Sequence, residues 1–475
     1  MEKQPTTLTR SGILVRMCPW LPSVEPLLQY DYVPFDDPRG AEKRFLFHRD
    51  GECGYFPAGM QEEISEFLSR EGVPFTFTDE RDRTRLFKPF KWDKLAALRP
   101  GQKEVLESII NHDHGIVVCS TGFGKSFLIG ELTKSYPKSR FIIAAPRIAE
   151  TKNIFNRLCE ILPRNEISLI GAGSKDPPNR RVAISVSNSL GKADFQNCDI
   201  FIFDEAHMCG HNSVTTKLLA TLCDSRNYGF TATPVGRSDK SDKVMESLFG
   251  REIARFDYQD CVDAGNVTQI HVVVYDVPGN IMSSQSPFGN AFVQNKRRYY
   301  WRNEVRNLTI ACVAREVPEN ESVLIMVESV DHLIQLAVML PEFAIVCGDG
   351  NDLKRRAKSL GFKLMNRNGD DKEESEKIYN DFRSGALKKV IATGVYRQGV
   401  DFPSLSVLIR ADGSPSPIAS GQIPGRLSRL SPGKTQAVLV DFRDMFNTNA
   451  LRNYYARMRT YKKNGWPIEH RGELK

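Results

Sequence analysis

A short glycine-containing segment between an apolar run and a helix-like run constrains this chain more than any other feature. Its seven residues are Ser120, Thr121, Gly122, Phe123, Gly124, Lys125 and Ser126. Glycines allow a tight turn whose backbone N–H groups face phosphate oxygens, and the following helix adds its positive N-terminal end. Lys125 is suited to reach the β- and γ-phosphates, and Ser126 to hold Mg²⁺. A turn that merely starts a helix is the alternative, but strand, loop, Lys-Ser and helix in this order favour nucleotide binding. Cys119 stands where such loops usually have their first glycine.

Two carboxylates follow another apolar run. Asp204 and Glu205 come directly after Ile200–Phe203. In phosphate-loop enzymes an Asp at a strand end supports Mg²⁺, and a neighbouring Glu is suited to orient and activate the attacking water. Alone, two acidic residues after a strand are more often only a turn. Together with the phosphate loop, they predict nucleotide hydrolysis with Mg²⁺ as a cofactor.

Short apolar runs alternate with helix-like stretches twice along the chain. The first series is Ile116–Cys119, Phe141–Ala145, Val182–Val186, Ile200–Phe203 and Tyr228–Thr231. The second is Ile270–Tyr275, Val323–Val327, Phe343–Val346, Lys389–Ala392, Val407–Ile409 and Ala437–Asp441. Such alternation predicts parallel strands joined by crossover helices. We therefore expect an α/β protein with two tandem parallel-sheet lobes, at residues 93–255 and 256–450.

The two ends of the chain differ from the lobes. Residues 1–92 contain strand-like runs at Gly12–Arg16 and Arg44–His48 and a helical pattern at Met60–Arg70. They predict a small N-terminal α+β module, a candidate for nucleic-acid binding. Residues 451–475 are basic and aromatic and are interpreted as a tail.

The bulk composition limits the setting and the partners. A net charge of +7 and a pI near 8.8 suit a polyanionic partner but equally a basic enzyme. None of the ten cysteines forms a Cys-x-x-Cys pair, which argues against a zinc ribbon, a disulfide framework and an oxidising compartment. No signal-like or membrane-length apolar run is present. We expect a cytoplasmic protein, in the host cytoplasm if it is phage-encoded, with no membrane partner.

Residues 95–445 resemble the superfamily 2 helicases, whose two lobes are RecA-like and which use ATP. Asp204-Glu205-Ala206-His207 is similar to motif II in its DEAH form. Gln102, in Arg99-Pro100-Gly101-Gln102, resembles the adenine contact upstream of the phosphate loop. The resemblance therefore implies that the predicted nucleotide is ATP.

Further motifs of the superfamily follow in order. Pro146 and Arg147 resemble motif Ia, which touches the nucleic-acid backbone. Thr231, Ala232 and Thr233 resemble motif III, which couples hydrolysis to strand movement.

The second lobe carries the remaining motifs. The Ala392–Asp401 segment resembles motif V, which implies Thr393 at the nucleic acid and Gly399 and Asp401 at the nucleotide. The Gln422–Arg429 segment fits the motif VI pattern Q-x-x-G-R-x-x-R. Arg426 and Arg429, three apart on one helix face, are implied to stabilise charge on the transferred phosphoryl group, and Gln422 to couple hydrolysis to movement.

The resemblance implies an ATP-driven nucleic-acid motor in which ATP binds to the first lobe and arginines of the second lobe complete the ATP site. Within the superfamily the chain is most similar to the UvsW-type helicases of T-even phages, with XPB- and RadD-like motors next. That likeness implies remodelling of branched or duplex DNA at forks, junctions and R-loops, alongside replication and recombination proteins. The alternatives are an RNA helicase, the motor subunit of a larger nuclease complex and a non-catalytic scaffold.

Two segments combine cations with aromatic side chains, as do surfaces that hold phosphates and stack bases. The first contains Lys296, Arg297, Arg298, Tyr299, Tyr300, Trp301, Arg302 and Arg306. The second contains Arg452, Tyr454, Tyr455, Arg457, Arg459, Tyr461, Lys462, Lys463 and Trp466. Tyrosine and tryptophan at helical spacing are more often core residues, so both interpretations stay open. No base-reading motif is visible, and we expect nucleic-acid affinity to fall steeply with salt.

Overall fold

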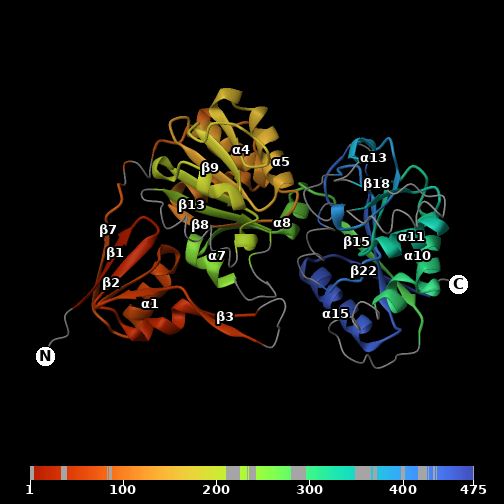
Figure 1. Cartoon of the computed structure of the whole chain (residues 1–475), viewed down its shortest axis with the longest axis horizontal. Coiled ribbons are helices and arrows are strands. Elements are labelled where there is room, and N and C mark those ends of the chain that lie inside the picture. The colour runs from red at the N-terminus through yellow and green to blue at the C-terminus, as the bar shows by residue number, and fades with distance from the viewer. Residues whose placement is uncertain are drawn as a thin grey trace. The chain divides into compact units, whose positions relative to one another are not determined.

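The predicted alternation of strands and helices is present twice. The computed structural model describes residues 5–33, 40–82, 84, 88–209, 225–232, 234, 242–279, 296–347, 365–366, 372–396, 402–415, 425, 427–431, 434 and 436–473. The chain divides into two compact units, Met1–Asp257 and Tyr258–Lys475, each with its own parallel sheet (Figure 1). Among the described helices, none is long and apolar enough to cross a membrane.

The first unit contains a seven-stranded parallel sheet in the order β10-β11-β9-β12-β13-β8-β14. Its strands are β8 (His114–Cys119), β9 (Phe141–Ala145), β10 (Ile167–Ile170), β11 (Val182–Val186), β12 (Ile200–Asp204), β13 (Arg226–Thr231) and β14 (Glu252–Phe256). The five predicted strands of this lobe are confirmed. The sequence did not indicate β10, a four-residue run, or β14, a partly exposed edge strand that carries Glu252 and Arg255.

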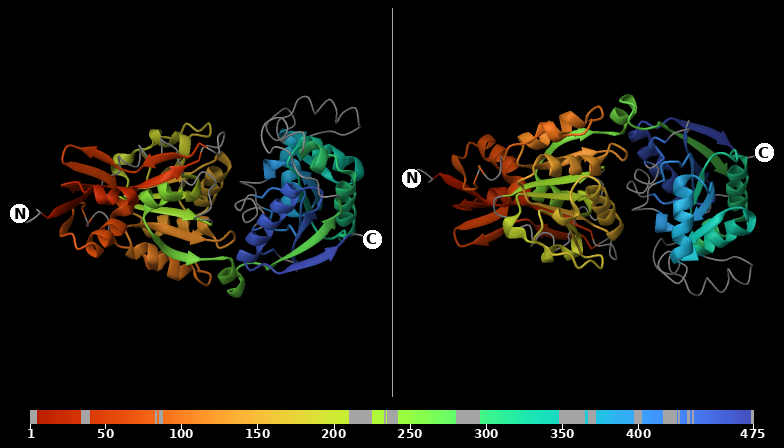
Figure 2. Two further views of the ribbon diagram at one scale, coloured as in Figure 1. Left: turned by 90° about the horizontal axis from the view of Figure 1, so that it is seen from below. Right: turned by 90° about the horizontal axis from the view of Figure 1, so that it is seen from above.

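Helices cover both faces of this sheet (Figures 1 and 2). They are α3 (Gln102–Asn111), α4 (Lys125–Ser135), α5 (Ile148–Cys159) and α7 (Asp242–Phe249). Successive strand side chains alternate between the faces, and β9 and β11 are buried along their whole length. That pattern is expected for a parallel sheet sandwiched between helices.

The N-terminal module is a five-stranded mixed sheet in the order β5-β6-β2-β1-β7, beside a two-stranded β3–β4 ribbon. Its elements are β1 (Thr6–Ser11), β2 (Leu14–Cys18), β3 (Gln29–Tyr32), β4 (Glu42–Phe45), β5 (His48–Asp50), β6 (Cys53–Pro57), α1 (Gln61–Arg70) and β7 (Phe75–Asp79). The α+β prediction and the helix are confirmed. The predicted strands are displaced, because Gly12 lies in the turn between β1 and β2, where its φ is +63°, and β4 ends at Phe45.

The module packs directly on the first parallel sheet. Ile13 belongs to the same buried cluster as Phe201 and Phe249. A Cβ added to Gly59 would lie 2.3 Å from the backbone oxygen of Glu246, so the two backbones approach closely there. Lys243 Nζ also donates to Glu63 Oε2 at 2.9 Å. Module and lobe therefore form one body within the first unit.

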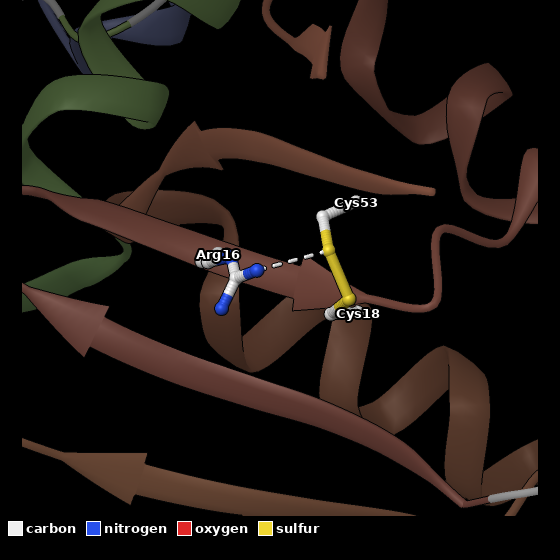
Figure 3. The surroundings of a disulfide bond; sticks show 3 residues. All are labelled: Arg16, Cys18 and Cys53. Carbon is white, nitrogen blue, oxygen red and sulfur yellow. Dashed lines mark hydrogen bonds between the residues drawn. A yellow bond between two sulfur atoms is a disulfide. The ribbon is translucent and has the colours of Figure 1, made fainter. Parts of the chain in front are cut away.

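One disulfide departs from the sequence-based expectation of reduced cysteines. Cys18, at the end of β2, is bonded to Cys53, at the start of β6, and Arg16 Nη2 lies 3.1 Å from the Cys53 sulfur (Figure 3). The strands β2 and β6 are antiparallel neighbours with Met17 opposite Gly54. Strand pairing thus brings together two cysteines that are 35 residues apart in the chain, a proximity that their spacing does not reveal.

The second unit contains an eight-stranded parallel sheet in the order β18-β17-β19-β16-β20-β21-β15-β22. Its strands are β15 (Ile270–Val277), β16 (Val323–Met326), β17 (Ala344–Cys347), β18 (Met365–Asn366), β19 (Lys389–Ala392), β20 (Val407–Arg410), β21 (Ala437–Asp444) and β22 (Ile468–Gly472). The helices are α8 (Tyr258–Asp263), α10 (Glu304–Glu316), α11 (Val330–Met339), α13 (Lys372–Ser384) and α15 (Thr448–Lys463), and Arg297–Trp301 forms one π-helical turn. All six predicted strands are confirmed. Residues 348–371 lie outside the described residues apart from β18.

Residues 451–475 are part of this second unit rather than a tail. They contain most of α15, which packs on β21, and β22, which pairs with β15 as the last strand of the sheet. Tyr454, Tyr461 and Trp466 are buried in the core. The sequence suggested a tail because the segment is rich in cations, whereas its aromatic side chains supply the buried face.

Candidate functional site

The motif residues of the first unit gather at one edge of its sheet. The glycine loop follows β8, Pro146 and Arg147 follow β9, Asp204 ends β12 and Thr231 ends β13. These four strands are neighbours in the order β9-β12-β13-β8. Since all are parallel, their carboxyl ends share one edge, where ligands of open α/β sheets bind.

The glycine loop has the backbone conformation that the sequence predicts. Gly122 and Gly124 have φ angles of +96° and +101°, which L side chains rarely adopt. Phe123, between them, is fully buried and its ring lies 4.7 Å from that of Phe256. Apolar packing therefore anchors the centre of the loop, and the two glycines let the backbone turn on either side of it.

The side chain of Gln102 is hydrogen-bonded to the backbone of this loop. Its Nε2 donates to the Phe123 carbonyl at 2.8 Å, and its Oε1 accepts from the Arg99 backbone N–H at 2.9 Å. The side chain is buried, and a Cβ added to Gly124 would lie 2.9 Å from Nε2. The structure thus places the predicted adenine contact against the loop backbone, where its amide holds the glycine loop.

Lys125 begins α4 directly after the loop. Its Nζ donates to the carbonyl of Cys119 at 3.2 Å, so the ammonium lies over the residue that ends β8. Ser120, Thr121 and Ser126 are partly exposed. Cys119 is tolerated at the usual glycine position because it is still a buried strand residue.

Asp204 and Glu205 form an acidic pair, and no arginine or lysine of the described residues forms an ion pair with either. Burial and the charge of Glu205 raise the pKa of Asp204 to about 7, although Lys125 opposes the shift. Glu205 has a φ of +55°, a strained conformation for a residue with a side chain, of a kind that clusters at active sites. Its Oε2 is buried and has no hydrogen-bond partner among the described residues; His207 Nδ1 lies 3.4 Å away.

Two further side chains complete this edge. His207 Nδ1 lies 3.0 Å from Thr231 Oγ1, so a hydrogen bond joins the end of β12 to the end of β13. Glu150, in the first turn of α5, lies 3.6 Å from Arg147 and contributes to the raised pKa of Asp204. The sequence analysis did not single out Glu150, since it has no recognisable motif spacing; only the fold brings it near Asp204.

Fewer of the predicted site residues of the second unit lie within the described part of the chain. Thr393 follows β19 and is buried, with its backbone N–H donating to the Val346 carbonyl at 3.1 Å. Arg429 is partly exposed. Gly399, Asp401, Gln422 and Arg426 lie outside the described residues, as do the rest of motif V after Tyr396 and, in the first unit, Thr233.

Lys434 supports the backbone of motif VI, a role that the sequence did not suggest. Its Nζ donates to the carbonyls of Leu427 and Arg429, the latter at 3.0 Å. Burial and the charge of Arg429 lower the pKa of Lys434 to about 8. The Thr268 backbone N–H also donates to the Ser428 carbonyl at 2.6 Å. The described part of motif VI is therefore held at several carbonyl groups.

The residues at the edge of the first sheet fit a nucleotide with Mg²⁺. The loop N–H groups and Lys125 suit phosphate oxygens, and the Ser126 hydroxyl and the Asp204 carboxylate are hard oxygen ligands of the kind Mg²⁺ prefers. A cation beside Asp204 would also relieve the unfavourable burial that raises its pKa.

Three family models match the chain. Residues 95–236 match the res subunit of type III restriction enzymes, residues 183–292 the SWI2/SNF2 ATPases, and residues 305–431 the helicase conserved C-terminal domain. Together they reach both parallel sheets, although β21 and β22 of the second sheet lie beyond the last matched residue.

Curated relatives are similar at low identity. The putative DNA 3'-5' helicase Rad25 of Halobacterium salinarum is 23% identical over 79% of this chain and 59% of its own length. The DNA 3'-5' translocase XPB2 of Sulfurisphaera tokodaii is 24% identical over 68% of this chain and 76% of its own length. The probable helicase D10 of Escherichia phage T5 is 23% identical over 84% and 82%. The chain spans only 53–60% of the length of three of its relatives.

Solved structures share the fold. An HsdR fragment of a type I restriction enzyme from Vibrio vulnificus matches with a TM-score of 0.57 at 14% identity, over 92% of this chain and 77% of that one. Dbp5 of S. cerevisiae, bound to RNA and ADP BeF3, matches with a TM-score of 0.55 at 15% identity, over 80% and 91%. T4 UvsW aligns over 99% of both chains at 15% identity, with a TM-score of 0.43.

Proposed function

Because the chain belongs to the superfamily 2 helicases, we propose that it is an ATP-dependent DNA helicase or translocase. One observation carries the proposal: the glycine loop with Lys125 and the strained Asp204–Glu205 pair lie at the same edge of one parallel sheet. A structural ion pair would neutralise Asp204, whereas here its pKa is raised to about 7.

Each residue of the first unit then has a chemical role. The loop N–H groups and Lys125 bind the phosphates, and Ser126 and Asp204 hold the Mg²⁺ that accompanies ATP and neutralises phosphate charge. Glu205, whose Oε2 has no hydrogen bond, accepts the proton of the attacking water. The His207–Thr231 contact links this carboxylate segment to motif III and so relays the state of the nucleotide.

The second unit and further motif residues of the first unit supply the remaining groups in this proposal. Arg426 and Arg429 stabilise charge on the transferred phosphoryl group, as arginine fingers do, while Gly399 and Asp401 approach the nucleotide. Thr393, Pro146 and Arg147 contact the nucleic-acid backbone, and Gln422, Ala232 and Thr233 couple hydrolysis to movement. Lys434 keeps the Arg429 backbone in place.

DNA is the proposed substrate because two of the relatives are named as a DNA helicase and a DNA translocase. We further propose branched DNA, in the company of replication and recombination proteins and in the cytoplasm of a host cell, on the motif resemblance to the UvsW-type phage helicases. Two alternatives compete with this proposal. The match to Dbp5 favours RNA as the substrate, and the match to HsdR favours a motor subunit of a nuclease complex.

ATP hydrolysis with different nucleic acids tests the proposal. Hydrolysis is measured without nucleic acid and with single-stranded DNA, forked or four-way DNA, and RNA of matched length. We expect the strongest stimulation with branched DNA. Lys125→Ala should lower hydrolysis about 10²-fold or more, because the developing phosphate charge loses its cation, while the exposed Lys175→Ala leaves it unchanged.

The other outcomes are equally informative. Stimulation by RNA alone would assign the protein to the RNA helicases. Absence of hydrolysis under every condition would contradict the proposal and favour a scaffold, or a motor that requires a partner subunit.

A further inference from the structure

The helix α15 has two faces of different character. Tyr454, Arg457 and Tyr461 point into the second unit and are at most 3% exposed. Arg452, Tyr455, Arg459 and Lys462 are exposed instead. Their spacing of three, four and three residues places them along one stripe of the helix. We call these four residues the outer stripe.

The outer stripe carries three cations and no acidic residue. Five of the 16 residues of α15 are arginine or lysine and none is acidic. Arg457 is neutralised by Asp441 at 2.8 Å. In contrast, no carboxylate among the described residues lies within ion-pair distance of Arg452, Arg459 or Lys462. An ordinary solvated helix face mixes both signs of charge, so this face is suited to an anionic partner.

An open hollow of about 450 Å³ lies on this face. Leu451, Tyr455 and Met458 contribute its apolar side chains, and Thr448 and the three cations of the outer stripe line the rest. Tyr455 is 52% exposed, so much of its ring is available to a ligand. An aromatic surface between cations is the arrangement that binds unpaired bases and their phosphates.

The other basic-aromatic segment of this unit lacks these properties. Arg297 and Arg302 both pair with Asp331, at 3.2 and 3.0 Å, and Arg306 is buried against Asp444 at 2.8 Å. Lys296 pairs with Glu328. Its cations are therefore mostly occupied by carboxylates of the protein itself, which leaves α15 as the available surface of the two.

We propose that the outer stripe of α15 binds a single strand of nucleic acid, with one base stacked on Tyr455 and the phosphates on Arg452, Arg459 and Lys462. This inference rests on the proposed motor function and adds a contact outside its motifs. Ten residues of helix cover about 15 Å, the length of about four stacked nucleotides. The contact would hold the strand while the motor binds and hydrolyses ATP.

Binding of labelled dT20 and rU20 without ATP, followed by fluorescence anisotropy, tests the site. Arg452→Gln/Arg459→Gln/Lys462→Gln should weaken binding at least tenfold and lower the slope of log affinity against log salt by about 2, since each lost phosphate contact on a single strand contributes about 0.7. Tyr455→Ala should weaken binding about fivefold or more, whereas Tyr455→Phe, which keeps the ring, should bind like wild type.

A charge-matched control separates a local site from general attraction. Lys377→Gln/Arg383→Gln/Lys388→Gln removes three cations at and just after α13 in the same unit and should change affinity less than twofold. Equal losses in both triple variants, or a wild-type affinity for Tyr455→Ala, would overturn the inference. ATP hydrolysis by wild type that ignores nucleic acid would instead contradict the proposed motor, whatever binds to α15.

Discussion

Both parallel sheets bury carboxylates on or just after their strands, but the partners of these carboxylates differ. In the first unit, Asp204 at the end of β12 has Glu205 beside it, and its pKa rises to about 7. In the second unit, Asp441 on β21 is bound by Arg457 at 2.8 Å, and Asp412 after β20 is bound by Arg410 at 3.1 Å. All four side chains of these two pairs are at most 1% exposed.

The difference distinguishes a carboxylate that is available for catalysis from carboxylates that stabilise the fold. A buried ion pair leaves neither charge available, so the arginines of the second unit mainly connect α15 to its sheet. A buried carboxylate without its own cation is unfavourable, and such perturbed groups are candidates for function. The first unit thus keeps an unfavourable charge at the site where a nucleotide and Mg²⁺ would bind, and the second unit neutralises its charges internally.

The largest expected effect comes from removing the charge of Glu205. Glu205→Gln should lower nucleic-acid-stimulated ATP hydrolysis about 10²- to 10⁴-fold, since the amide cannot accept the proton of the attacking water. Steady-state hydrolysis measures the loss, and a fluorescent ATP analogue should show retained nucleotide binding. The exposed Glu252→Gln is the control. If Glu205→Gln hydrolysed ATP within threefold of the wild-type rate, the acidic pair of the first unit would not be catalytic.

The next effect is expected in the second unit and concerns stability. Arg457→Met should destabilise this unit by about 3–5 kcal/mol, because it leaves Asp441 buried and unpaired. Hydrogen exchange in β21 and α15 measures the change. Arg459→Met, two residues away on the exposed face, should change stability by less than about 0.5 kcal/mol. If Arg457→Met and Arg459→Met behaved alike, the buried pair would not be structural.

The smallest effect is a gain in stability that depends on pH. Below pH 3.8, the pKa of Asp204 in the unfolded chain, the carboxyl group is protonated in both states. As the pH rises from 3.8 toward about 7, the unfolded chain releases this proton and the folded protein keeps it. The free energy of unfolding therefore falls over this pH range. Asp204→Asn removes this penalty. It should stabilise the nucleotide-free protein by at most about 4 kcal/mol above pH 7, at about 1.4 kcal/mol per pKa unit.

Thermal unfolding between pH 5 and 8 without nucleotide or Mg²⁺ measures this gain. It should grow with pH for Asp204→Asn, and the exposed Asp93→Asn should show no such trend. A gain that is constant over this range would mean that Asp204 is already ionised at pH 5.

The sequence alone predicted much of the candidate site, because each of its groups follows an apolar run that is recognisable by itself. The glycine loop, Lys125 and the Asp204–Glu205 pair each follow an apolar strand directly, and parallel strands bring such ends to one edge. The roles of Gln102 and Glu150 were not predictable in this way. Gln102 meets the loop across 21 residues, and Glu150 reaches the vicinity of Asp204 only through the order of β9 and β12 in the sheet.

The two basic-aromatic segments show the same limit. In sequence, 296–306 and 452–466 have equivalent composition, and both suit nucleic acid equally well. The structure pairs the cations of the first with Asp331, Asp444 and Glu328, and divides those of the second between a buried Arg457 and the outer stripe.

The sequence by itself determined the two α/β lobes and the position of the glycine loop between a strand and a helix, because strand periodicity and the loop are local patterns. Only the tertiary structure decided which charges are neutralised, which cysteines meet and which face of α15 stays exposed. Those outcomes depend on contacts between residues far apart in the chain, such as Arg457 with Asp441 and Cys18 with Cys53. The spacing of residues along the chain does not predict such contacts, since they arise only when strands pair and helices pack.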